Sequence, residues 1–451
     1  MKPSRRNFLK TTAVAGSVAA ISQTTVGADD SKKLRLAAIG VGGPRGRYNR
    51  GGQIARDAAR HANMVAVCDV DDVHTAAFNK DFGGKLNTYR DYREMLEKEK
   101  PDVVTIGTPD HWHVPIAIAC LKAGADVYCE KPLTLTIDEG KQIRKVVEET
   151  GRVFQVGTQQ RSTADKFLTA IAIVQSGRLG KNVNAYVAIG GAPGSGPFEY
   201  TEAPQDLDWN LWVGPAPEAD YCKERRREFR WYFEYSGGKM TDWGAHHIDI
   251  AQWALSPGET GPVKVAGTGK FPKIVPSDFN WNAFLNGEAK LPNGFNTATE
   301  FSIDLTFDNG SVMNVNHHYK REGTNIDFPN GILFEGEEGR IFVNRGKLEG
   351  KLIDEMKGES AEDFRKEIEE RIVELCKGKK PGNHMKNFFD CIEDRSKPIS
   401  DVWSHHRTMT SCHLCNIALM LGRELKWDPK SEQFIDDEQA NALMSRKSRE
   451  V

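Results

Sequence analysis

The sequence predicts an α/β protein with an N-terminal doubly wound parallel sheet, followed by an α+β domain with a mostly antiparallel open sheet. Between residues 34 and 157, short apolar strands alternate with helical segments, which is typical of parallel strands joined by right-handed crossovers. After residue 157, longer segments show the period-two alternation of half-buried strands. The chain has 451 residues, more than one hydrophobic core usually holds, so two domains are expected.

The first domain is expected over residues 34–157. Its strands are predicted at 34–39, 64–68, 103–107, 125–129 and 153–156. Its helices are predicted from about Gln53 and at 73–82, 89–99, 114–123 and 137–150. Ligands of such sheets bind beyond the carboxyl ends of the strands, which is where the following residues fall: Gly40, Asp69, Thr108 and Glu130-Lys131-Pro132.

The second domain is expected over residues 158–451, for substrate binding and oligomerisation. It begins with a helix at 163–176, and its strands are predicted at 183–189, 263–267, 299–307 and 311–318. Asp308-Asn309-Gly310 joins the last two as a hairpin turn. Long loops at 190–233 and 271–295 are available to shape a pocket. Helices at 361–376, 384–395 and 405–422 are predicted to pack back on the body of the protein.

Glycines at the end of the first strand indicate a dinucleotide site of the Rossmann type. Gly40 makes the tight turn, Gly42 lets the backbone approach a pyrophosphate, and Gly46 is the third glycine of the run. Asp69 ends the second strand, where its carboxylate accepts hydrogen bonds from ribose hydroxyls and repels a 2'-phosphate. NAD is therefore expected. NADP stays possible because three arginines lie near the turn: Arg45, Arg47 and Arg50.

The first 28 residues are predicted to be a twin-arginine signal peptide. Ser4-Arg5-Arg6 opens it, a mildly apolar stretch follows, and Val26-Gly27-Ala28 is a small-residue cleavage site. Export to the periplasm is expected. Removing the four cationic residues of this segment changes the formal net charge from −2 to −6, which argues against nucleic-acid binding and against a polybasic membrane anchor.

Cysteine and histidine spacing does not predict a metal. The chain has eight cysteines, and most are expected to be buried free thiols because twin-arginine substrates fold in a reducing compartment. Cys412 and Cys415 have C-x-x-C spacing but lie in a helical run without a second ligand pair. His111 and His113 also lack an evident carboxylate or thiol partner.

Two separated motifs predict hydride transfer at a C–OH group. Lys131 can polarise the oxygen, and His246 can move the hydroxyl proton. Asp242 precedes His246 by four residues, so on a helix it shares a face with the imidazole and is expected to orient it. The residues expected to contact a sugar or polyol substrate are Gln160, Arg161, Arg230, Trp231 and His247.

Taken together, these motifs resemble the Gfo/Idh/MocA oxidoreductase family, in an exported, twin-arginine-signal subgroup. The shared motifs are the glycine turn, the run Thr108 to His113, Cys129 to Pro132, and G-G-x-x-x-D-x-G-x-H-x-x-D from Gly237. The resemblance implies that Lys131, Asp242 and His246 form the catalytic group. It also implies cofactor contacts at Gly40, Gly42, Asp69, Thr108, Pro109, His113 and Glu130.

Three functions are compatible with this pattern. The first is an NAD(P)-dependent oxidoreductase of sugars or polyols with a tightly bound, recycled cofactor. The second is an NAD-dependent glycoside hydrolase or lyase that oxidises the sugar transiently, and the third is a sugar-binding protein without turnover. The tryptophan-rich loops and the apolar alternation of residues 299–318 also predict a homodimer or homotetramer.

Overall fold

The computed structural model describes residues 33–450, apart from 45, 47 and 259. The predicted signal peptide, residues 1–28, lies outside the described residues, as do Arg45 and Arg47. From Leu34 onward the chain forms one compact unit. No helix among the described residues is long and apolar enough to cross a membrane.

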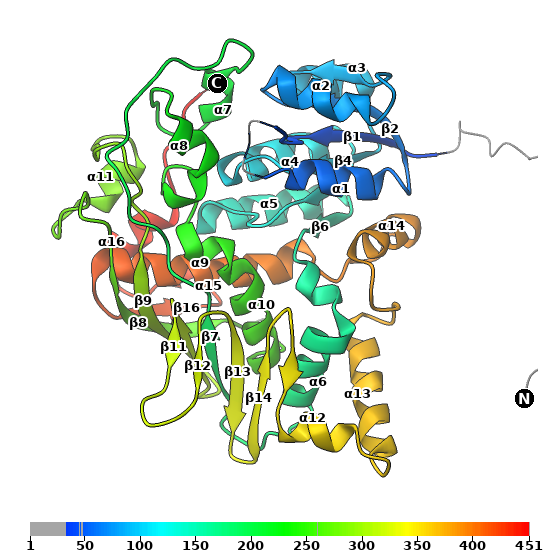
Figure 1. Ribbon diagram of the computed structural model, residues 1–451, viewed down its shortest axis with the longest axis vertical. Helices are drawn as coiled ribbons and strands as arrows, with labels where there is room; N and C mark the ends of the chain where they lie inside the picture. The colour runs from blue at the N-terminus through cyan, green and yellow to red at the C-terminus, as the bar shows by residue number, and fades with distance from the viewer. Residues whose placement is uncertain (1–32, 45, 47, 259, 451) are drawn as a thin grey trace, which may run out of the picture. The chain divides into compact units, whose positions relative to one another are not determined.

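The first sheet confirms the predicted doubly wound topology (Figure 1). Within the described residues it has six parallel strands in the order β3-β2-β1-β4-β5-β6. The strands are β1 (Arg35–Ile39), β2 (Asn63–Cys68), β3 (Asn87–Tyr89), β4 (Val103–Ile106), β5 (Asp126–Cys129) and β6 (Phe154–Val156). The helices are α1 (Arg50–Ala58), α2 (Asp72–Lys80), α3 (Tyr92–Glu99), α4 (His113–Lys122) and α5 (Ile137–Thr150).

Two details of this half differ from the prediction. Strand β3 was not predicted, because Asn87-Thr88-Tyr89 is short and largely polar and forms its strand by pairing with the edge of β2. Helix α1 begins at Arg50 rather than near Gln53. Gly51 and Gly52 therefore lie inside a helix, where their missing side chains allow close packing against the glycine turn.

The second sheet is mostly antiparallel, as predicted. In the described part of the chain its strands run β15-β14-β13-β7-β10-β9-β8-β16-β17, and β7 with β10 is the parallel pair. The strands are β7 (Asn184–Ala188), β8 (Pro262–Lys270), β9 (Glu300–Phe307), β10 (Val312–Asn316), β13 (Gly331–Gly336), β14 (Gly339–Val343), β15 (Leu348–Glu349), β16 (Leu425–Asp428) and β17 (Gln433–Phe434). The predicted β9–β10 hairpin is confirmed, whereas the strands after residue 318 were not predicted.

The alternation in β9 has an intramolecular explanation. Phe301, Ile303 and Leu305 are buried, and helices α10 (Gly244–Leu255) and α15 (Val402–Leu421) of the same chain pack on this sheet. Glu300, Ser302 and Asp304 alternate with them and are exposed. The apolar residues of β9 thus do not form an open face for a partner. The homodimer or homotetramer stays a prediction.

The last helices pack on the body, as expected. They are α13 (Glu362–Leu375), which packs on α6 (Thr169–Gln175) of the second half, and α14 (His384–Asp394) and α15, which contact the nucleotide-binding half. Gln155 Nε2 on β6 donates to the His384 carbonyl at 2.7 Å. The Leu133 N–H, next to Lys131-Pro132, donates to His405 Nε2 at 3.2 Å. Contacts of this kind fix the two halves to each other around the site.

All eight cysteines lie within the described residues, and they are free and buried. Cys412 and Cys415 sit inside α15 among apolar side chains of the second core. Burial raises the pKa of the Cys415 thiol above its usual range, so this pair behaves as core rather than as a reactive or ligating dithiol.

Candidate functional site

The glycine turn after β1 has the tight geometry that the sequence predicts. Gly40 has φ +73° and Gly42 has φ +63°, a backbone region that favours glycine. A Cβ on Gly51 would lie 1.8 Å from the Gly40 carbonyl oxygen. Gly51 therefore lets α1 pack closely on the turn, and Gly46, the third glycine of the predicted run, lines the pocket.

Asp69 lines the pocket and also forms hydrogen bonds with the backbone of the glycine turn. Its Oδ2 accepts the N–H groups of Val41 at 3.0 Å and Gly42 at 3.1 Å. The sequence predicted only a contact with ribose hydroxyls. In this structure the carboxylate also fixes the turn, and its Oδ1 accepts the Asp71 N–H at 3.1 Å and lies 3.4 Å from His74 Nδ1.

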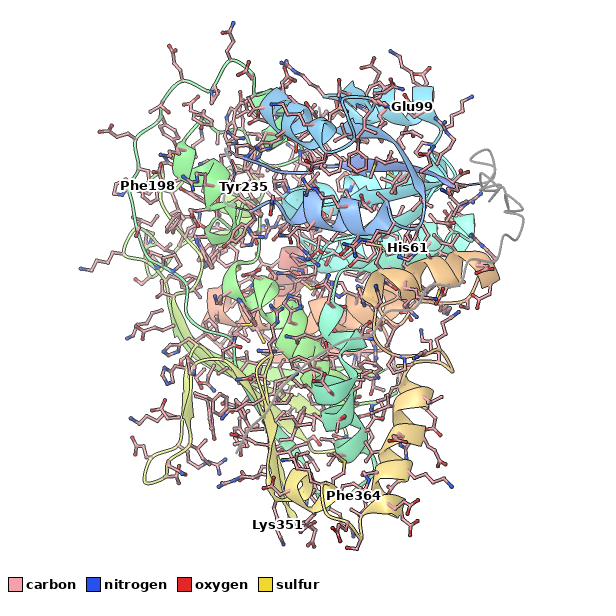
Figure 2. All side chains as sticks on the ribbon, turned by 45° about the vertical axis from the view of Figure 1, so that its right-hand side comes forward. His61, Glu99, Phe198, Tyr235, Lys351 and Phe364 are labelled. Carbon is pink, nitrogen blue, oxygen red and sulfur yellow. The ribbon has the colours of Figure 1, made fainter. Side chains whose placement is uncertain are left out.

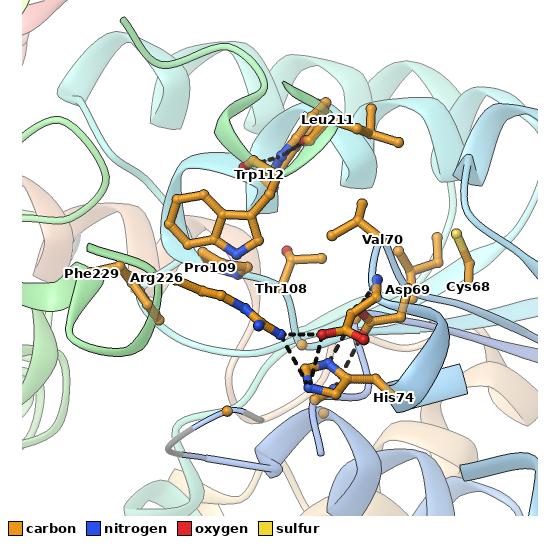
Figure 3. Close-up of a pocket in the computed structure, with 18 of the residues that line it drawn as sticks. Cys68, Asp69, Val70, His74, Thr108, Pro109, Trp112, Leu211, Arg226 and Phe229 are labelled. Atoms are coloured by element: carbon orange, nitrogen blue, oxygen red, sulfur yellow. Dashed lines mark hydrogen bonds and ion pairs between the residues drawn. The ribbon is translucent and has the colours of Figure 1, made fainter. Parts of the chain in front are cut away.

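A pocket lies between the glycine turn and the loops of the second half (Figure 3). Thr108 and Pro109 line it from the first half, as predicted, and Leu207, Arg226 and Phe229 line it from the second. Within the described residues, three buried polar atoms that face it have no hydrogen-bond partner: Thr108 Oγ1, Arg227 Nε and Arg230 Nη1. Cationic and hydroxyl donors beside a glycine turn fit a pyrophosphate and its riboses, so the residues present fit a dinucleotide.

The aromatic residues in the run from Thr108 to His113 make two different sets of contacts. Trp112 Nε1 donates to the Leu211 carbonyl at 2.9 Å, and His111 Nε2 lies 2.9 Å from the Trp212 carbonyl. His113 lies 2.6 Å from the Pro132 carbonyl through Nδ1 and 2.9 Å from the Thr108 carbonyl through Nε2. His113 thus positions both cofactor loops from a buried place rather than contacting the cofactor itself.

Glu130, predicted as a cofactor contact, is engaged by the protein. Its Oε1 accepts Arg50 Nε at 2.8 Å and Gln159 Nε2 at 3.2 Å. Arg50 lines the nucleotide pocket. Glu130 therefore holds Arg50 in place, and Arg50 is the residue of this pair that lines the pocket.

Lys131 and Asp242 form the polar centre of the candidate active site. Lys131 Nζ donates to Asp242 Oδ1 at 2.6 Å and to the Asp242 carbonyl at 2.9 Å. Although burial opposes its ionisation, Lys131 and Arg230 hold the pKa of Asp242 below its usual range. The ion pair fixes the lysine ammonium near the edge of β5, within reach of the pocket.

The predicted orientation of His246 by Asp242 is wrong. Helix α9 (Gly238–Asp242) ends at Asp242, and α10 starts at Gly244. This break turns the carboxylate to Lys131 instead of along one continuous helical face. Asp242 consequently positions the lysine. The imidazole is placed by the first turn of α10 and by edge contact with Trp243, at 5.9 Å between ring centroids.

His246 has the properties of a proton acceptor. It is 6% exposed, and its Nδ1 has no hydrogen-bond partner in the described part of the chain. Burial, followed by the charges of Lys131 and Arg345, lowers the pKa of His246 well below its usual value. The imidazole is thus neutral near pH 7, which is the form that can accept a hydroxyl proton.

Two of the predicted substrate contacts do lie at this centre. The Gln160 amide lies 3.0 Å from the His246 carbonyl and 3.1 Å from Arg345 Nε. Arg230 Nε lies 3.4 Å from Asp242 Oδ1, and its guanidinium stacks on the Tyr48 ring. Because Arg230 also lines the nucleotide pocket, it lies where the cofactor and substrate regions meet.

The other three residues predicted to contact the substrate interact with other parts of the protein instead. Arg161 is 3% exposed and pairs with Asp249, with distances of 2.7 and 2.6 Å. Trp231 packs in an aromatic cluster and donates to Glu228 at 3.3 Å. His247 Nε2 lies 3.0 Å from Asn330 Oδ1, and burial lowers its pKa to about 4. We therefore correct Arg161 to a structural role, and Trp231 and His247 are placed as packing residues.

Sequence reasoning missed Arg226, Arg227 and Arg345. Arg345 follows β14 in a turn, and its guanidinium lies 4.6 Å from the Trp243 ring centroid. Arg226 reaches across the pocket toward Asp71 and His74 (Figure 3). The run Arg225-Arg226-Arg227 was a visible signal, but a cluster of arginines in a long loop more often forms a solvated surface.

No cluster of three or more histidine, cysteine, aspartate or glutamate side chains suited to a metal occurs within residues 33–450, leaving aside 45, 47 and 259. Arg230 joins the Lys131–Asp242 pair to the pocket at the glycine turn. A lysine, a carboxylate and a neutral imidazole near such a turn are of the class found in pyridine-nucleotide oxidoreductases.

Comparison with known proteins places the chain in that class. The chain belongs to the Gfo/Idh/MocA oxidoreductase family. Residues 34–158 match the family's NAD-binding Rossmann fold, and residues 192–274 and 302–451 match its C-terminal alpha/beta domain. The cofactor is accordingly NAD, and the chain is an oxidoreductase.

Individual relatives share moderate similarity. D-glucoside 3-dehydrogenase of Escherichia coli is 24% identical over 350 residues, which cover 74% of this chain and 85% of that protein. Inositol 2-dehydrogenase of Rubrobacter xylanophilus is 29% identical over 133 residues, 29% of this chain and 37% of that protein. Levoglucosan dehydrogenase of Pseudarthrobacter phenanthrenivorans is 27% identical over 268 residues, 58% and 60% respectively.

Solved structures share the fold. WlbA dehydrogenase of Bordetella pertussis, in complex with NADH and UDP-GlcNAcA, has a TM-score of 0.59 at 16% identity, covering 88% of this chain and 99% of that one. Aldose-aldose oxidoreductase of Caulobacter crescentus, complexed with glycerol, has a TM-score of 0.58 at 17% identity, covering 88% and 100%.

Proposed function

We propose that this chain is an exported NAD-dependent oxidoreductase that moves hydride to or from a carbon-bound hydroxyl of a sugar or polyol. The observation that carries the proposal is the Lys131–Asp242 pair beside the buried, neutral His246. The names of the relatives support the substrate class, because they are dehydrogenases of a glucoside, an inositol and levoglucosan.

The protein's own residues divide the proton chemistry between them. The bound NAD supplies the hydride acceptor and donor. Lys131, held by Asp242, polarises the oxygen of the reacting carbon and stabilises negative charge on it. His246 accepts the hydroxyl proton on its neutral imidazole during oxidation and returns it during reduction. Gln160 and Arg230 stand beside these groups to hydrogen-bond the other hydroxyls.

We also propose that the cofactor stays bound and is recycled in place. Residues 1–28 carry the twin-arginine pattern, and free dinucleotide is expected to be scarce in the periplasm. One sugar or polyol is then oxidised and another carbonyl compound is reduced on the same nucleotide. Asp69 at the adenosine end favours NAD over NADP, because its charge repels a 2'-phosphate.

The test is to purify the full chain from the periplasm, release the nucleotide by denaturation and determine its identity by mass. We expect one NAD or NADH per chain. A panel of polyols should then reduce the bound cofactor, and a carbonyl compound should reoxidise it. A protein that is empty as isolated and needs added NAD contradicts recycling. Nitrophenol release from a glycoside without net change in NADH would favour the glycoside hydrolase instead.

The predicted homodimer or homotetramer is part of the same proposal. Light scattering at micromolar concentration measures the mass directly. A monomeric mass contradicts it.

A further inference from the structure

A segment of the second half, residues 206–230, crosses the nucleotide pocket opposite the glycine turn. We call this segment the strap. It contains α7 (Trp209–Val213) and α8 (Lys223–Arg227), and its residues Leu207, Leu211, Trp212, Arg226, Arg227, Phe229 and Arg230 line the pocket. Figure 1 shows the strap beside the first sheet. A dinucleotide bound between the two would therefore lie under the strap.

Backbone contacts fasten the strap to the loop after β2. Asp71 and Leu207 form an antiparallel bridge. The Asp72 N–H donates to the Asp206 carbonyl at 3.0 Å, and the Asp208 N–H donates to the Val70 carbonyl at 2.9 Å. The strap is thus joined to the residues that follow Asp69, at the adenosine end of the pocket.

A buried ion pair reinforces this junction. Arg226 of α8 pairs with Asp71, and the two side chains are 6% and 1% exposed. Arg226 also lies 3.4 Å from His74 Nε2. Because an unpaired buried charge is costly, this pair favours the closed position of the strap.

A second set of contacts fastens the strap near the reaction end. The Trp112 indole donates to the Leu211 carbonyl, and a Cβ on Gly214 would lie 2.3 Å from the Trp112 ring. Tyr235, just past the strap, lies 5.0 Å from His111 between ring centroids. Figure 2 shows Tyr235 beside the nucleotide-binding half and Phe198 farther from it.

The outer side of the strap is covered by the end of the chain, residues 446–449, which we call the latch. Arg449 Nε donates to the Gly214 carbonyl at 2.9 Å, and its Nη1 and Nη2 donate to Asn210 at 2.8 and 3.0 Å. Its backbone N–H donates to the Pro215 carbonyl at 3.0 Å. Figure 1 shows the C-terminus beside α7.

Arg446, at the start of the latch, points into the protein. It donates to the Phe233 carbonyl just beyond the strap, and burial lowers the pKa of its guanidinium to about 10. The latch therefore contacts α7 and the segment that leads from the strap to α9, on the side opposite the pocket.

We propose that the latch holds the strap closed over NAD and sets the rate at which the cofactor leaves. The proposal rests on the proposed function in assigning the pocket to a retained nucleotide. It assigns Arg449 a positioning role, because Arg449 contacts the strap and not the cofactor. Loss of several hydrogen bonds from one charged side chain should speed dissociation about 10- to 100-fold.

The test follows exchange of the bound cofactor on the full chain. Protein as isolated is mixed with excess isotope-labelled NAD, and the labelled fraction of bound nucleotide is measured by mass over time. Arg449→Ala should exchange about 10- to 100-fold faster than wild type, and Arg449→Lys should fall between them. Arg423→Ala is the matched control, because Arg423 pairs with Asp437 on the surface of the same terminal region, away from the strap.

A second variant ends the chain at Ser445 and removes the whole latch. It should exchange at least as fast as Arg449→Ala while keeping the wild-type unfolding midpoint within the range of the control. Equal exchange rates in wild type and both latch variants overturn the proposal. If wild type is isolated without nucleotide, recycling fails, and the same comparison on NAD-loaded protein still decides the role of the latch.

Discussion

Asp242 ends α9 and pairs with Lys131, whereas Asp249 lies inside α10 and pairs with Arg161. Both carboxylates come from one sequence run, and both bind a cation at 2.6 Å. The Lys131 and Asp242 side chains retain 12% and 16% exposure, but those of Arg161 and Asp249 retain 4% and 0%. Asp249 also accepts Thr408 Oγ1 at 2.6 Å.

This difference in exposure distinguishes an ion pair that can take part in a reaction from one that only stabilises the fold. The Arg161–Asp249 pair is held by Thr408 of α15 and by the Ile399 carbonyl, and its side chains are almost fully buried, beside a cavity separate from the one at the glycine turn. The Lys131–Asp242 pair is next to Arg230, which lines the nucleotide pocket, and to His246, whose Nδ1 is unpaired among described residues. A charged pair that leaves donors and acceptors open toward a pocket is a candidate for chemistry.

The largest expected effect comes from removing the proposed proton acceptor on the open side. His246→Gln should lower turnover by about 10²- to 10⁴-fold, the range of positioned acid and base groups. Because its pKa is lowered, His246 is neutral at pH 7. Turnover should fall only when the pH drops through the pKa of His246, well below 6.5. The variant should therefore also lose this acidic limb, measured as turnover against pH.

His318→Gln is the matched control for that experiment. His318 pairs with Asp327 on an exposed hairpin at 2.6 Å, remote from the pocket lining, and its replacement should leave turnover unchanged. If His246→Gln keeps both the rate and the pH profile, the proton acceptor lies elsewhere. The α9–α10 segment is then not catalytic in the way proposed.

Breaking the closed pair should act on stability instead. Arg161→Met leaves the Asp249 carboxylate buried without its cation, which typically costs about 3–5 kcal/mol. We expect a lower denaturation midpoint in urea, with NAD content and turnover of the folded fraction unchanged. Lys386→Met, which removes an exposed pair with Asp390, should show no measurable shift. A selective loss of turnover in Arg161→Met would restore Arg161 to the substrate site.

Lys131→Met should lower turnover by about 10²- to 10³-fold, the usual effect of removing one group that stabilises charge on a reacting oxygen. The loss should occur at all pH values, and the acidic limb should move to higher pH, because the Lys131 charge is one of the causes that lower the pKa of His246. Bound NAD should remain, since the glycine turn and Asp69 still hold it. Lys122→Met, at the exposed end of α4, is the control. Loss of the nucleotide in Lys131→Met would instead show that Lys131 holds the cofactor.

Much of this fold follows from local sequence. The parallel strands are short, continuously apolar and separated by amphipathic helices, so their positions and order can be predicted. The strands after residue 318 could not be predicted, because β13 and β14 carry charged and glycine positions. β13 is defined by pairing with β7, and β14 by pairing with β13. Likewise β3 depends on its neighbour β2 for its strand conformation.

The residues of the candidate site divide in the same way, into those that local sequence predicts and those that depend on distant contacts. Gly40, Gly42, Lys131 and His246 could be identified because each lies at a fixed place relative to a strand end or helix. The partners of Asp242 and Arg161 could not, because each pairs with a residue 111 or 88 positions away along the chain. Arg226, Arg345 and the latch are likewise placed by long-range packing, which no local pattern predicts.

The smallest expected effect concerns Asp242, and it tests the comparison most directly. Asp242→Asn keeps the size and one oxygen of the side chain but removes the charge that holds Lys131. Hydrogen bonds to a charged group are worth about 1.5–3 kcal/mol, so turnover should fall by about 10- to 10²-fold, less than in Lys131→Met. Because the Asp242 charge raises the pKa of His246, its removal should move the acidic limb assigned to His246 to lower pH. In the double variant Asp242→Asn with Lys131→Met, the loss should equal that of Lys131→Met alone, since the carboxylate acts through the lysine. Additive losses in turnover, measured across this double-mutant cycle, would mean that Asp242 has a separate contact with the substrate.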